Sequence, residues 1–509
     1  MKPKVLLFYT ELGFAGSYVV QAPISLVYIA TRLFNNPDVE IEIIDCRVEN
    51  NWQTLISRRL AEDNILMAGF FVMSGLQVSK AYEVTKFIKS QKDVPIVWGG
   101  PHPTILPKEV MDYGLVDFCI RGFGIGAFTD LVKGFIDGRG KFEAIPNLCF
   151  KKSDGEIVIG EINSQYERIH FKDLPYHLLD PFIEKYFQNK KHRDFPIYTS
   201  FGCPYLCNFC ISPIWFKDTN KKWDPLPAQE VVDHIEFLQK RYRIDLIYFW
   251  DDDTFVRPSH FTGIAREIVD RGLKVQIGVR GIRANEVDRM KKEDFDLLEA
   301  VGVKYLHIGI ENGSQRILDL MQKGIRVEQS LETNRKLAEY KNIIPMYNML
   351  CGIPTETIED LQQTGLFMLQ IANENPNCII FDPGKLIPYP GGNAFELAVK
   401  HGYISPKTPQ DWSKLDQEED VIQPWYTPQY NQYIHMLEVT SYAISNWEKY
   451  LEDYPGWLRW SYKVIKFFYK PIAVFRLKAK KADFLIEHRL LDIGKKIVTA
   501  LAPSKRESS

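Results

Sequence analysis

Short apolar runs alternate with longer amphipathic stretches over the first 140 residues. Stretches such as 24–34 and 78–90 carry apolar residues at helical spacing between runs of strand length. This alternation predicts a parallel sheet covered by helices, so residues 1–140 are expected to form a doubly wound α/β domain. The runs are Val5–Tyr9, Ile41–Asp45, Ile65–Val72, Pro95–Trp98 and Phe118–Ile120.

Glycine-rich turns follow four of these runs, at residues 12–16, 73–75, 99–103 and 122–126. The carboxyl ends of parallel strands share one edge of a sheet, where ligands bind, and glycine lets the backbone approach a ligand closely. Each turn alone is explained by a tight chain reversal. Four turns at one edge favour a cofactor pocket.

A second alternation begins at Ile197, after a predicted linker over 141–195 that carries a hairpin at 149–159. It supplies six further strand-length runs, two fewer than a full eight-fold barrel, so residues 196–395 are predicted to form a partial (β/α)₆ barrel. Residues 396–509 are expected to be helical. The runs are Ile197–Ser200, Leu246–Trp250, Val275–Val279, Tyr305–Ile310, Pro345–Leu350 and Ile379–Leu386.

Composition fits this multidomain picture. The 509 residues exceed one domain, and 45% hydrophobic with 25% charged residues is typical of globular proteins. The net charge of −2 gives no global basic field, so no nucleic-acid partner is expected. The small total conceals an asymmetry, because residues 459–509 carry thirteen Lys and Arg against four Asp and Glu, or +9, which leaves −11 for the rest.

The basic C-terminal segment predicts an amphipathic helix. Its apolar face would contain Trp457, Trp460, Val464, Phe467 and Phe468. Its opposite face would carry Arg459, Lys463, Lys466 and Lys470, before a break or kink at Pro471. Two arrangements fit: a helix packed on the barrel with a solvated basic face, which we prefer, and a helix at a membrane interface. The sequence contains no recognisable signal peptide or spanning segment, so we expect a cytoplasmic protein, with peripheral membrane contact as the alternative.

Three of the eight cysteines, Cys203, Cys207 and Cys210, form a Cys-x₃-Cys-x₂-Cys motif after a predicted strand. Thiolates at these intervals can reach three corners of a cubane iron–sulfur cluster and leave the fourth iron open for a ligand. A zinc site would need a fourth ligand, and no second Cys-x₂-Cys pair exists in the sequence. The motif therefore predicts a 4Fe–4S cluster in a protein of a reducing compartment.

With Phe209 before the third cysteine, the motif resembles that of the radical S-adenosylmethionine (SAM) superfamily. The resemblance implies that the three cysteines hold the cluster and that SAM binds the open iron. An external one-electron reductant would supply the electron that cleaves SAM to a 5′-deoxyadenosyl radical. Phe209 would lie beside the adenine.

Other predicted strand ends match the same superfamily. Arg280 ends the third barrel strand, residues 308–314 match the fourth-strand segment, and residues 352–357 match the motif after the fifth, with Thr355 in place of glycine. Residues 388–392 match the closing segment, except that Gly392 replaces threonine. Which of three adjacent aspartates contacts the methionyl amine stays open. The SAM-binding residues that the resemblance implies are Phe209, Asp251, Asp252, Asp253, Arg280, Glu311, Gly352 and Pro354.

The first 140 residues resemble the cobalamin-binding domain that precedes many such barrels, through the helix start at 23–26 and the turns at 99–103 and 122–126. Two features depart from the pattern. The Asp-x-His-x-x-Gly motif is absent, and the Gly-Glu-Gly-Glu loop of the subfamily has Phe123 and Ile125 in place of its carboxylates. We expect cobalamin to be retained through backbone contacts, with loss of the pocket as the alternative, and His102 to be either a pocket or a turn residue. The implied cobalamin-binding residues are Gly13, Ser74, Gly75, Gly99, Gly100, His102, Gly122, Gly124 and Gly126.

The resemblance implies a cobalamin-dependent radical methyltransferase that acts on an unactivated carbon of a small hydrophobic substrate, lipid-like or a tetrapyrrole. The alternative is radical ring closure or oxidation without methyl transfer, as in the anaerobic porphyrin cyclases. RNA methylthiolation fits less well, because those enzymes carry further cluster cysteines, whereas Cys46, Cys119 and Cys149 here are dispersed in predicted strands. A carrier without catalysis would not need the strand-end motifs.

Overall fold

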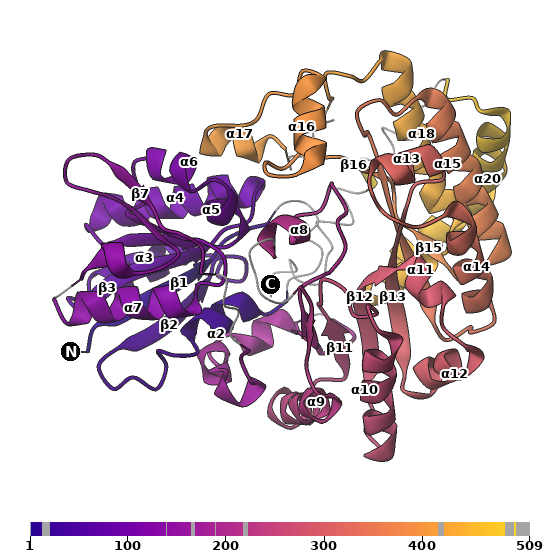
Figure 1. Cartoon of the computed structure of the whole chain (residues 1–509). Helices are drawn as coiled ribbons and strands as arrows, with labels where there is room; N and C mark the ends of the chain where they lie inside the picture. The colour runs from indigo at the N-terminus through magenta and orange to yellow at the C-terminus, as the bar shows by residue number, and fades with distance from the viewer. Residues whose placement is uncertain are drawn as a thin grey trace.

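The computed structural model contains two parallel sheets side by side, with helices of the C-terminal region over the second (Figure 1). The sheets share one hydrophobic core, which runs from Val5 in the first to Phe249 in the second. The structure describes residues 2–12, 21–138, 140–163, 168–188, 190–216, 222–415, 422–483 and 493–494.

The first sheet has the strand order β2-β1-β3-β4-β5-β6-β7. The first five strands are parallel and confirm the predicted doubly wound domain, and β1 is buried along its whole length. The hairpin expected in the linker forms as β6 and β7 and adds two antiparallel strands to the sheet edge. The strands are β1 (Lys4–Tyr9), β2 (Glu40–Asp45), β3 (Ile65–Phe71), β4 (Ile96–Gly99), β5 (Phe118–Ile120), β6 (Leu148–Lys151) and β7 (Ile157–Ile159).

Helices cover both faces of this sheet because its strands are apolar on both sides. Helices α2 and α7 pack on one face, and the buried residues of α3, α4 and α6 pack on the other. The helices are α2 (Ile24–Ala30), α3 (Trp52–Leu60), α4 (Leu76–Gln91), α5 (Pro101–Ile105), α6 (Pro107–Asp112) and α7 (Ile125–Ile136). The 3₁₀ turn η1 (Phe142–Ala144) lies between α7 and β6, and three more connect the two sheets: η2 (Phe171–Asp173), η3 (Tyr176–Leu179) and η4 (Ile183–Tyr186).

The second sheet is parallel and open, with the order β15-β14-β13-β12-β11-β8 and β16 paired to β14. All six predicted runs lie at or beside strands of this sheet, which confirms the partial barrel. The first strand begins at Asp194, earlier than expected, and the last run divides into β15 and β16. The strands are β8 (Asp194–Ile197), β11 (Leu246–Phe249), β12 (Gln276–Arg283), β13 (Val303–Glu311), β14 (Ile344–Cys351), β15 (Ile379–Ile380) and β16 (Gly384–Lys385).

Helices follow the barrel strands, and a small antiparallel pair, β9 (Ser200–Phe201) with β10 (Asp224–Pro225), flanks the cysteine loop. The helices are α8 (Ser212–Trp215), α9 (Ala228–Tyr242), α10 (Pro258–Asp270), α11 (Ala284–Asp288), α12 (Lys292–Ala300), α13 (Gln315–Leu320), α14 (Val327–Ala338) and α15 (Ile358–Glu374). Figure 1 shows α8 between the two sheets.

The C-terminal helices extend in two directions. Helix α17 reaches back to the first domain and contacts α4, whereas α18 packs on α15 and α20 packs on α18 (Figure 1). Among the described residues, no helix is long and apolar enough to cross a membrane. The elements are α16 (Asn393–Lys400), α17 (Pro409–Ser413), α18 (Pro428–Ile444), α19 (Trp447–Tyr450), η5 (Leu451–Asp453) and α20 (Gly456–Ala479).

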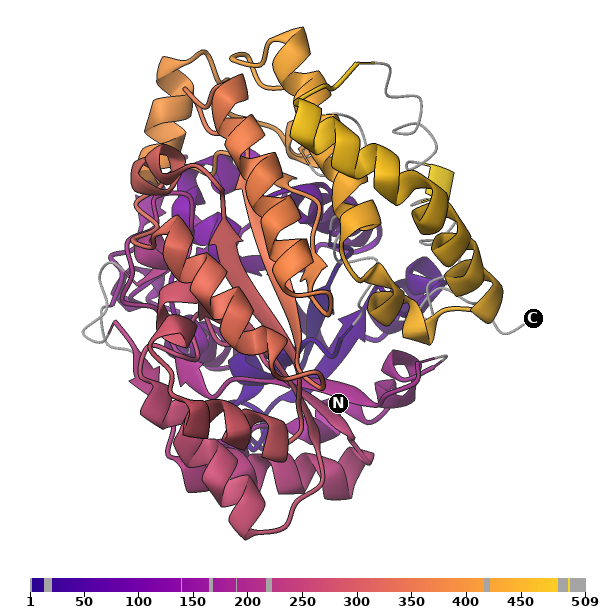
Figure 2. The same cartoon turned by 90° about the vertical axis from the view of Figure 1, so that its right-hand side faces the viewer.

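The preferred arrangement of the C-terminal helix was wrong about which face packs. Helix α20 does lie on the protein body, as the outermost yellow helix of Figure 2. However, Trp457, Trp460, Phe467 and Phe468 of the predicted packing face are 55–76% exposed. The opposite face is the packed one. The domain boundaries at 140, 195 and 395 stay predictions.

Replacing Trp412 tests the return contact of α17. This side chain is fully buried, and its indole Nε1 donates to Glu109 Oε1 at 2.7 Å. Trp412→Ala should lower the free energy of unfolding by about 3 kcal/mol or more, because it leaves a large cavity. Denaturant unfolding checks this, with the exposed Trp457→Ala as the control, which should change stability by less than about 0.5 kcal/mol. Equal effects would contradict the assignment.

Candidate active site

The cysteine motif lies on an irregular loop between β9 and α8, which hydrogen bonds fix at several points. Asn208 donates its backbone N–H to Met321 O at 3.1 Å and its side-chain Nδ2 to Leu320 O at 2.7 Å. Gly202 has φ +86°, and a Cβ there would lie 2.4 Å from Lys222 O. Only glycine therefore fits the point where the loop leaves β9.

The surroundings of the thiols in this loop fit an iron–sulfur cluster, whose iron ions supply positive charge. Cys207 is buried and accepts a hydrogen bond from Arg283 Nη1 at 3.0 Å, and Cys210 Sγ accepts one from the Ser212 backbone N–H at 3.5 Å. Burial raises the pKa of the Cys203 and Cys210 thiols, so a bound metal must favour their thiolate forms. N–H donors to sulfur are the usual partners of cluster ligands.

No group of three His, Cys, Asp or Glu in the described part of the chain has the geometry for a single metal ion. This finding is compatible with a cubane, because each thiolate binds a different iron at a separate corner. The donor set of three thiols and an arginine therefore fits a 4Fe–4S cluster.

Two of the three adjacent aspartates hold the cysteine loop in place. Asp251 accepts from the backbone N–H groups of Thr199 at 2.6 Å and Ser200 at 3.1 Å, and burial raises its pKa to about 6. Asp252 accepts from Ser212 Oγ at 2.6 Å and from the Gly202 N–H at 3.3 Å, so it connects both ends of the loop. These carboxylates position the loop from the end of β11.

Asp253 has different surroundings. Its side chain is 2% exposed, and its pKa is raised well above the usual value by burial and by the neighbouring carboxyl of Glu286. Glu286 is itself fully buried and accepts a hydrogen bond from Tyr205 Oη at 2.6 Å. Two buried carboxyls near Cys203 favour a cation between them.

The prediction that Arg280 ends its strand was wrong, because β12 continues to Arg283. Gly281 adopts φ +64° within an irregularity of the pairing with β13, and this displaces the strand end by three residues. Arg283 reaches the cysteine loop, where its guanidinium lies 3.8 Å from the centre of the Tyr205 ring. The Arg280 guanidinium lies over the rings of Tyr248 and Trp250 instead.

The end of β13 brings Glu311 close to the cysteine loop through Lys323, which the sequence did not suggest. Lys323 Nζ lies 2.7 Å from Glu311 Oε1 and 5.8 Å from the centre of the Phe209 ring. Burial lowers the pKa of Lys323, but the charges of Glu311 and Cys207 outweigh burial and keep it raised. A Cβ at Gly309 would lie 2.4 Å from Glu311 Oε1, so the glycine leaves space for this ion pair.

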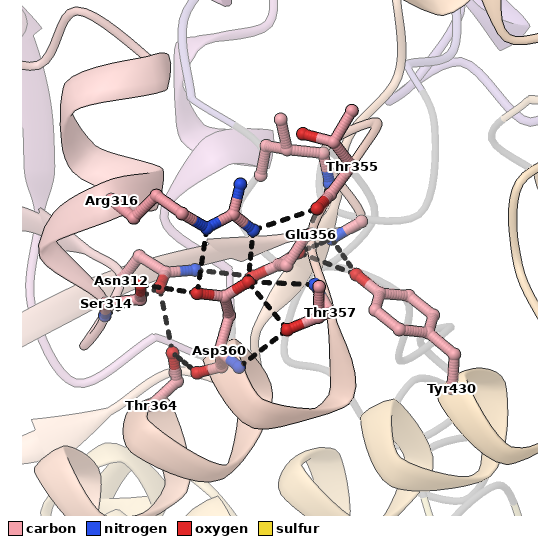
Figure 3. Close-up of polar contacts among 11 residues, drawn as sticks. Asn312, Ser314, Arg316, Thr355, Glu356, Thr357, Asp360, Thr364 and Tyr430 are labelled. Carbon is pink, nitrogen blue, oxygen red and sulfur yellow. Dashed lines mark hydrogen bonds and ion pairs between the residues drawn. The ribbon is translucent and has the colours of Figure 1, made fainter.

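The turn after β14 is held by the carboxylate of Glu356 (Figure 3). This carboxylate accepts from the N–H of Gly352 at 2.6 Å, Tyr430 Oη at 2.6 Å and Asn312 Nδ2 at 2.8 Å. Burial raises the pKa of Glu356, and these donors oppose the rise. The predicted SAM-binding residues Gly352 and Pro354 lie in this turn, and Gly352 has φ +80°.

A second carboxylate, Asp360, joins the ends of β13 and β14 (Figure 3). It accepts from Ser314 Oγ at 2.6 Å and the Thr357 N–H at 2.9 Å, and it pairs with Arg316. Burial alone would raise the pKa of Asp360, but hydrogen bonds from Arg316, Ser314 and Thr357 outweigh it and lower the pKa to about 2. The predicted motif after the fifth barrel strand is thus a rigid, hydrogen-bonded turn.

The predicted cobalamin-binding residues gather at the carboxyl edge of the first sheet, after β3, β4 and β5. Gly75 and Gly100 precede α4 and α5 with φ +107° and +105°, and a Cβ at Gly100 would lie 2.9 Å from Val72 O. Gly124 precedes α7, so three helices begin at this edge; at the start of α5, Pro101 and Pro103 have no N–H and His102 donates its N–H to Val72 O. The edge brings together Ser74, Gly75, Gly99, Gly100, His102, Gly122, Gly124 and Gly126, while Gly13 lies outside the described residues.

His102 is a packed residue of α5. Its ring is fully buried, Nδ1 lies 3.1 Å from Ser74 Oγ and Nε2 lies 3.3 Å from Tyr113 Oη. Trp412 packs edge-on against it at 4.8 Å, and burial lowers the pKa of His102 to about 3. Since both ring nitrogens have partners within the protein, this structure favours the turn residue over the pocket residue.

The carboxyl edge of the first sheet faces the cysteine loop. Phe123, in the loop where the subfamily carries carboxylates, lies 6.2 Å from Trp215 and 5.7 Å from Phe216 by ring centres. A pocket nearby is lined by Phe209 and Cys210 on one side and by Leu386, Tyr389 and Gly392 on the other. The substitution by Phe123 therefore supplies part of the contact between the two domains.

Comparisons with known proteins agree with this architecture. The radical SAM superfamily matches residues 197–368, and the B12 binding domain matches residues 14–132. An uncharacterized methyltransferase of Pyrococcus horikoshii is 25% identical over 77% of this chain and 82% of its own length. The anaerobic magnesium-protoporphyrin IX monomethyl ester cyclase of Rubrivivax gelatinosus is 24% identical over 53% of this chain, and the match spans 48% of that protein.

A solved structure has the same fold over most of its length. The radical SAM methyltransferase TsrM from Kitasatospora setae, with cobalamin and a 4Fe–4S cluster bound, superposes with a TM-score of 0.64 and 18% identity, covering 88% of this chain and 89% of that one. The chain therefore contains a radical SAM domain over residues 197–368, preceded by a B12 binding domain over residues 14–132. It is an enzyme of the radical SAM type whose cofactors are a 4Fe–4S cluster, SAM and cobalamin, as the sequence predicted.

Arg283 should set the reduction potential of the cluster. Arg283→Leu removes a positive charge and an N–H donor from Cys207, so the reduced cluster loses stabilisation and the potential should fall by on the order of 50 mV. An anaerobic redox titration followed by electron paramagnetic resonance measures this. Arg280→Leu on the same strand is the matched control, and an equal shift there would contradict the role of Arg283. A variant with alanine at all three loop cysteines should lack the cluster signal.

Asp360 should make the protein acid-labile. Its pKa of about 2 lies below the value of about 3.9 for an unfolded aspartate, so its stabilising effect is complete above about pH 4 and is lost as the pH falls toward 2. Asp360→Asn should lower stability at neutral pH and flatten the stability curve over this range. Denaturant unfolding at several pH values tests this, with the exposed Asp270→Asn as the control. An unchanged slope would exclude Asp360 as the cause.

Proposed function

We propose that this protein is a cobalamin-dependent radical SAM methyltransferase that acts on an unactivated carbon of a small substrate. The observation that carries the proposal is that the helix starts at one sheet edge face the cysteine loop of the other, with Phe123 against Trp215 and Phe216. When bound, the cofactors supply a hydrogen-abstracting radical and a methyl group. We propose that the facing edges place both cofactors near one substrate.

The side chains around the cysteine loop have separate proposed roles. Cys203, Cys207 and Cys210 hold the cluster, and Arg283 donates to Cys207. Asp253, together with Glu286, is the carboxylate proposed to face the methionyl amine, because Asp251 and Asp252 already accept from the loop. The other residues proposed to contact SAM are Phe209, Glu311, Lys323, Gly352 and Pro354.

The substrate is proposed to be apolar with an acidic group. Alternate residues of β11 and β12, such as Phe249 and Val279, point into the core under the helices. Arg280 and Tyr248 lie on the other face of the sheet. There His307 stacks on Phe381 with ring centres 5.9 Å apart.

Arg280 supplies the charge on this face. In the described part of the chain it forms no ion pair, and neither its Nε nor Trp250 Nε1 has a hydrogen-bond partner. A guanidinium among aromatic rings favours a carboxylate or phosphate on a flat or extended apolar molecule. A tetrapyrrole carboxylate or an acidic lipid has this chemistry. Arg280 is thus proposed to bind substrate rather than SAM.

Product counting separates methyl transfer from ring closure. The reconstituted protein is incubated without oxygen with SAM, methylcobalamin, a one-electron reductant and a panel of acidic tetrapyrroles and lipids. Methyl transfer should give S-adenosylhomocysteine and 5′-deoxyadenosine in equal amounts once the cobalamin has turned over. Formation of 5′-deoxyadenosine with little S-adenosylhomocysteine would support cyclisation instead, and neither product from any member would reject the proposal.

Arg280→Leu tests the substrate class in the same assay. The change should raise KM for an acidic substrate at least about tenfold, because a charged group loses its partner. It should leave substrate-free formation of 5′-deoxyadenosine unchanged. A loss of that substrate-free reaction would return Arg280 to SAM binding, while an unchanged KM would exclude it from substrate recognition.

A further inference from the structure

Helix α20 is attached to the protein by one side only. Tyr462 Oη donates to Tyr442 O at 2.8 Å, and Lys466 Nζ donates to Ser445 O at 2.5 Å. About two and three turns after Lys466 on the same side, Ala473 and Leu477 are fully buried. These contacts fix the helix on α18 and α15 and decide which side remains outside (Figure 2).

The outward side is apolar and aromatic. We define the aromatic face by five residues at helical spacing, which are 55–76% exposed: Trp457, Trp460, Phe467, Phe468 and Phe475. All exposed aromatic side chains among the large hydrophobic residues of the described chain lie on this one helix, and Ile465 and Ile472 extend its apolar surface. Single exposed apolar residues need no explanation, but a continuous patch of this kind marks a contact surface.

The charged residues of α20 itself have one sign, while Glu448 pairs with Lys463 beside the helix. Helix α20 contains no Asp or Glu in its 24 residues, and Arg459, Lys470 and Lys478 are exposed on it. Lys480 and Lys481 follow directly and are exposed as well. At 100° per residue, Lys478 lies at the angle of Trp460, beside the rings, whereas Arg459 and Lys470 lie near the angle of the buried Leu477 and are exposed there.

We propose that the aromatic face of α20 binds the surface of an anionic phospholipid bilayer. Indole and phenyl rings prefer the boundary between head groups and acyl chains, while flanking lysines and arginines pair with lipid phosphates. Helix α20 would lie in the plane of the surface over about 36 Å of its length. The packed side of α20 then contacts the rest of the enzyme. In an isolated amphipathic helix, the side away from the membrane would contact only water.

The positive charges of α20 argue against two other partners for the aromatic face. A second copy of this helix would bring lysines and arginines against their own kind, with no Asp or Glu in either copy of the helix. The chain's own residues 484–509 carry five Lys and Arg against three Asp and Glu, so they are repelled too. An anionic lipid surface is complementary to every exposed charge of α20. The proposal does not depend on methyl transfer.

Vesicle sedimentation tests the proposal with the full-length protein. Binding should be strong to phosphatidylcholine vesicles that contain phosphatidylglycerol, weak to pure phosphatidylcholine, and reduced by salt. Burial of each ring contributes roughly tenfold in partitioning, so W460S/F467S/F468S should lower binding by at least about a hundredfold. The matched control is Ile404→Ser, a change at an 85% exposed apolar residue outside α20, which should bind as the parent does.

A charge variant and a truncation separate the remaining outcomes. Arg459→Gln with Lys470→Gln and Lys478→Gln should keep the aromatic face but lose the preference for phosphatidylglycerol. Removal of residues 484–509 should leave vesicle binding unchanged.

Three results would overturn the proposal: equal binding of the aromatic variant and its parent, vesicle binding that appears only after the truncation, and self-association without vesicles that W460S/F467S/F468S abolishes. The first would exclude the aromatic face, the second would make the C-terminal segment its occupant, and the third would make it an interface between copies. Thermal unfolding of each variant verifies that these surface changes leave the fold intact.

Discussion

Buried carboxylates at the ends of the barrel strands are the interactions on which the rest of the site depends. A carboxylate that leaves water without partners is strongly destabilising, so Asp251 and Glu356 are tolerated only where several donors converge on them. The donors are backbone N–H groups and hydroxyls next to the cysteine loop and in the turn after β14. Each carboxylate therefore fixes a loop that the sheet alone would leave irregular.

The hydrogen bonds that fix the cysteine loop also determine where the two domains contact each other. The fixed cysteine loop leads directly into α8. Trp215 of α8 packs edge-on against Phe123, which follows the first sheet. An apolar residue at position 123 is a departure from the related cobalamin loops, and this contact gives it a physical reason. Helices α4 and α7 still begin at this edge after β3 and β5, so the departure does not remove the helix starts that a cofactor would use.

Much of the fold could be predicted from the sequence, because long apolar runs between helical stretches have few alternatives as parallel strands. The cysteine loop was equally readable, since its spacing is local. Contacts between segments far apart in the sequence could not be predicted in this way. Lys323, after the end of α13, reaches Glu311 before its start, and Arg283 replaces Arg280 because one irregularity at Gly281 lengthens a strand. Periodicity found the two faces of α20, but it carries no information on which face the body covers.

The return of α17 to the first domain adds the buried Trp412 to the contacts between the halves of the molecule, beside the shared core and Phe123. Separation of the sheet edges would expose the indole of Trp412, at a free energy on the order of 2–3 kcal/mol from this side chain alone. Molecules with parted edges are then a minority of at most roughly a few per cent. The edges stay together for most of the life of the protein, which would shield a reactive radical formed between them from water and oxygen.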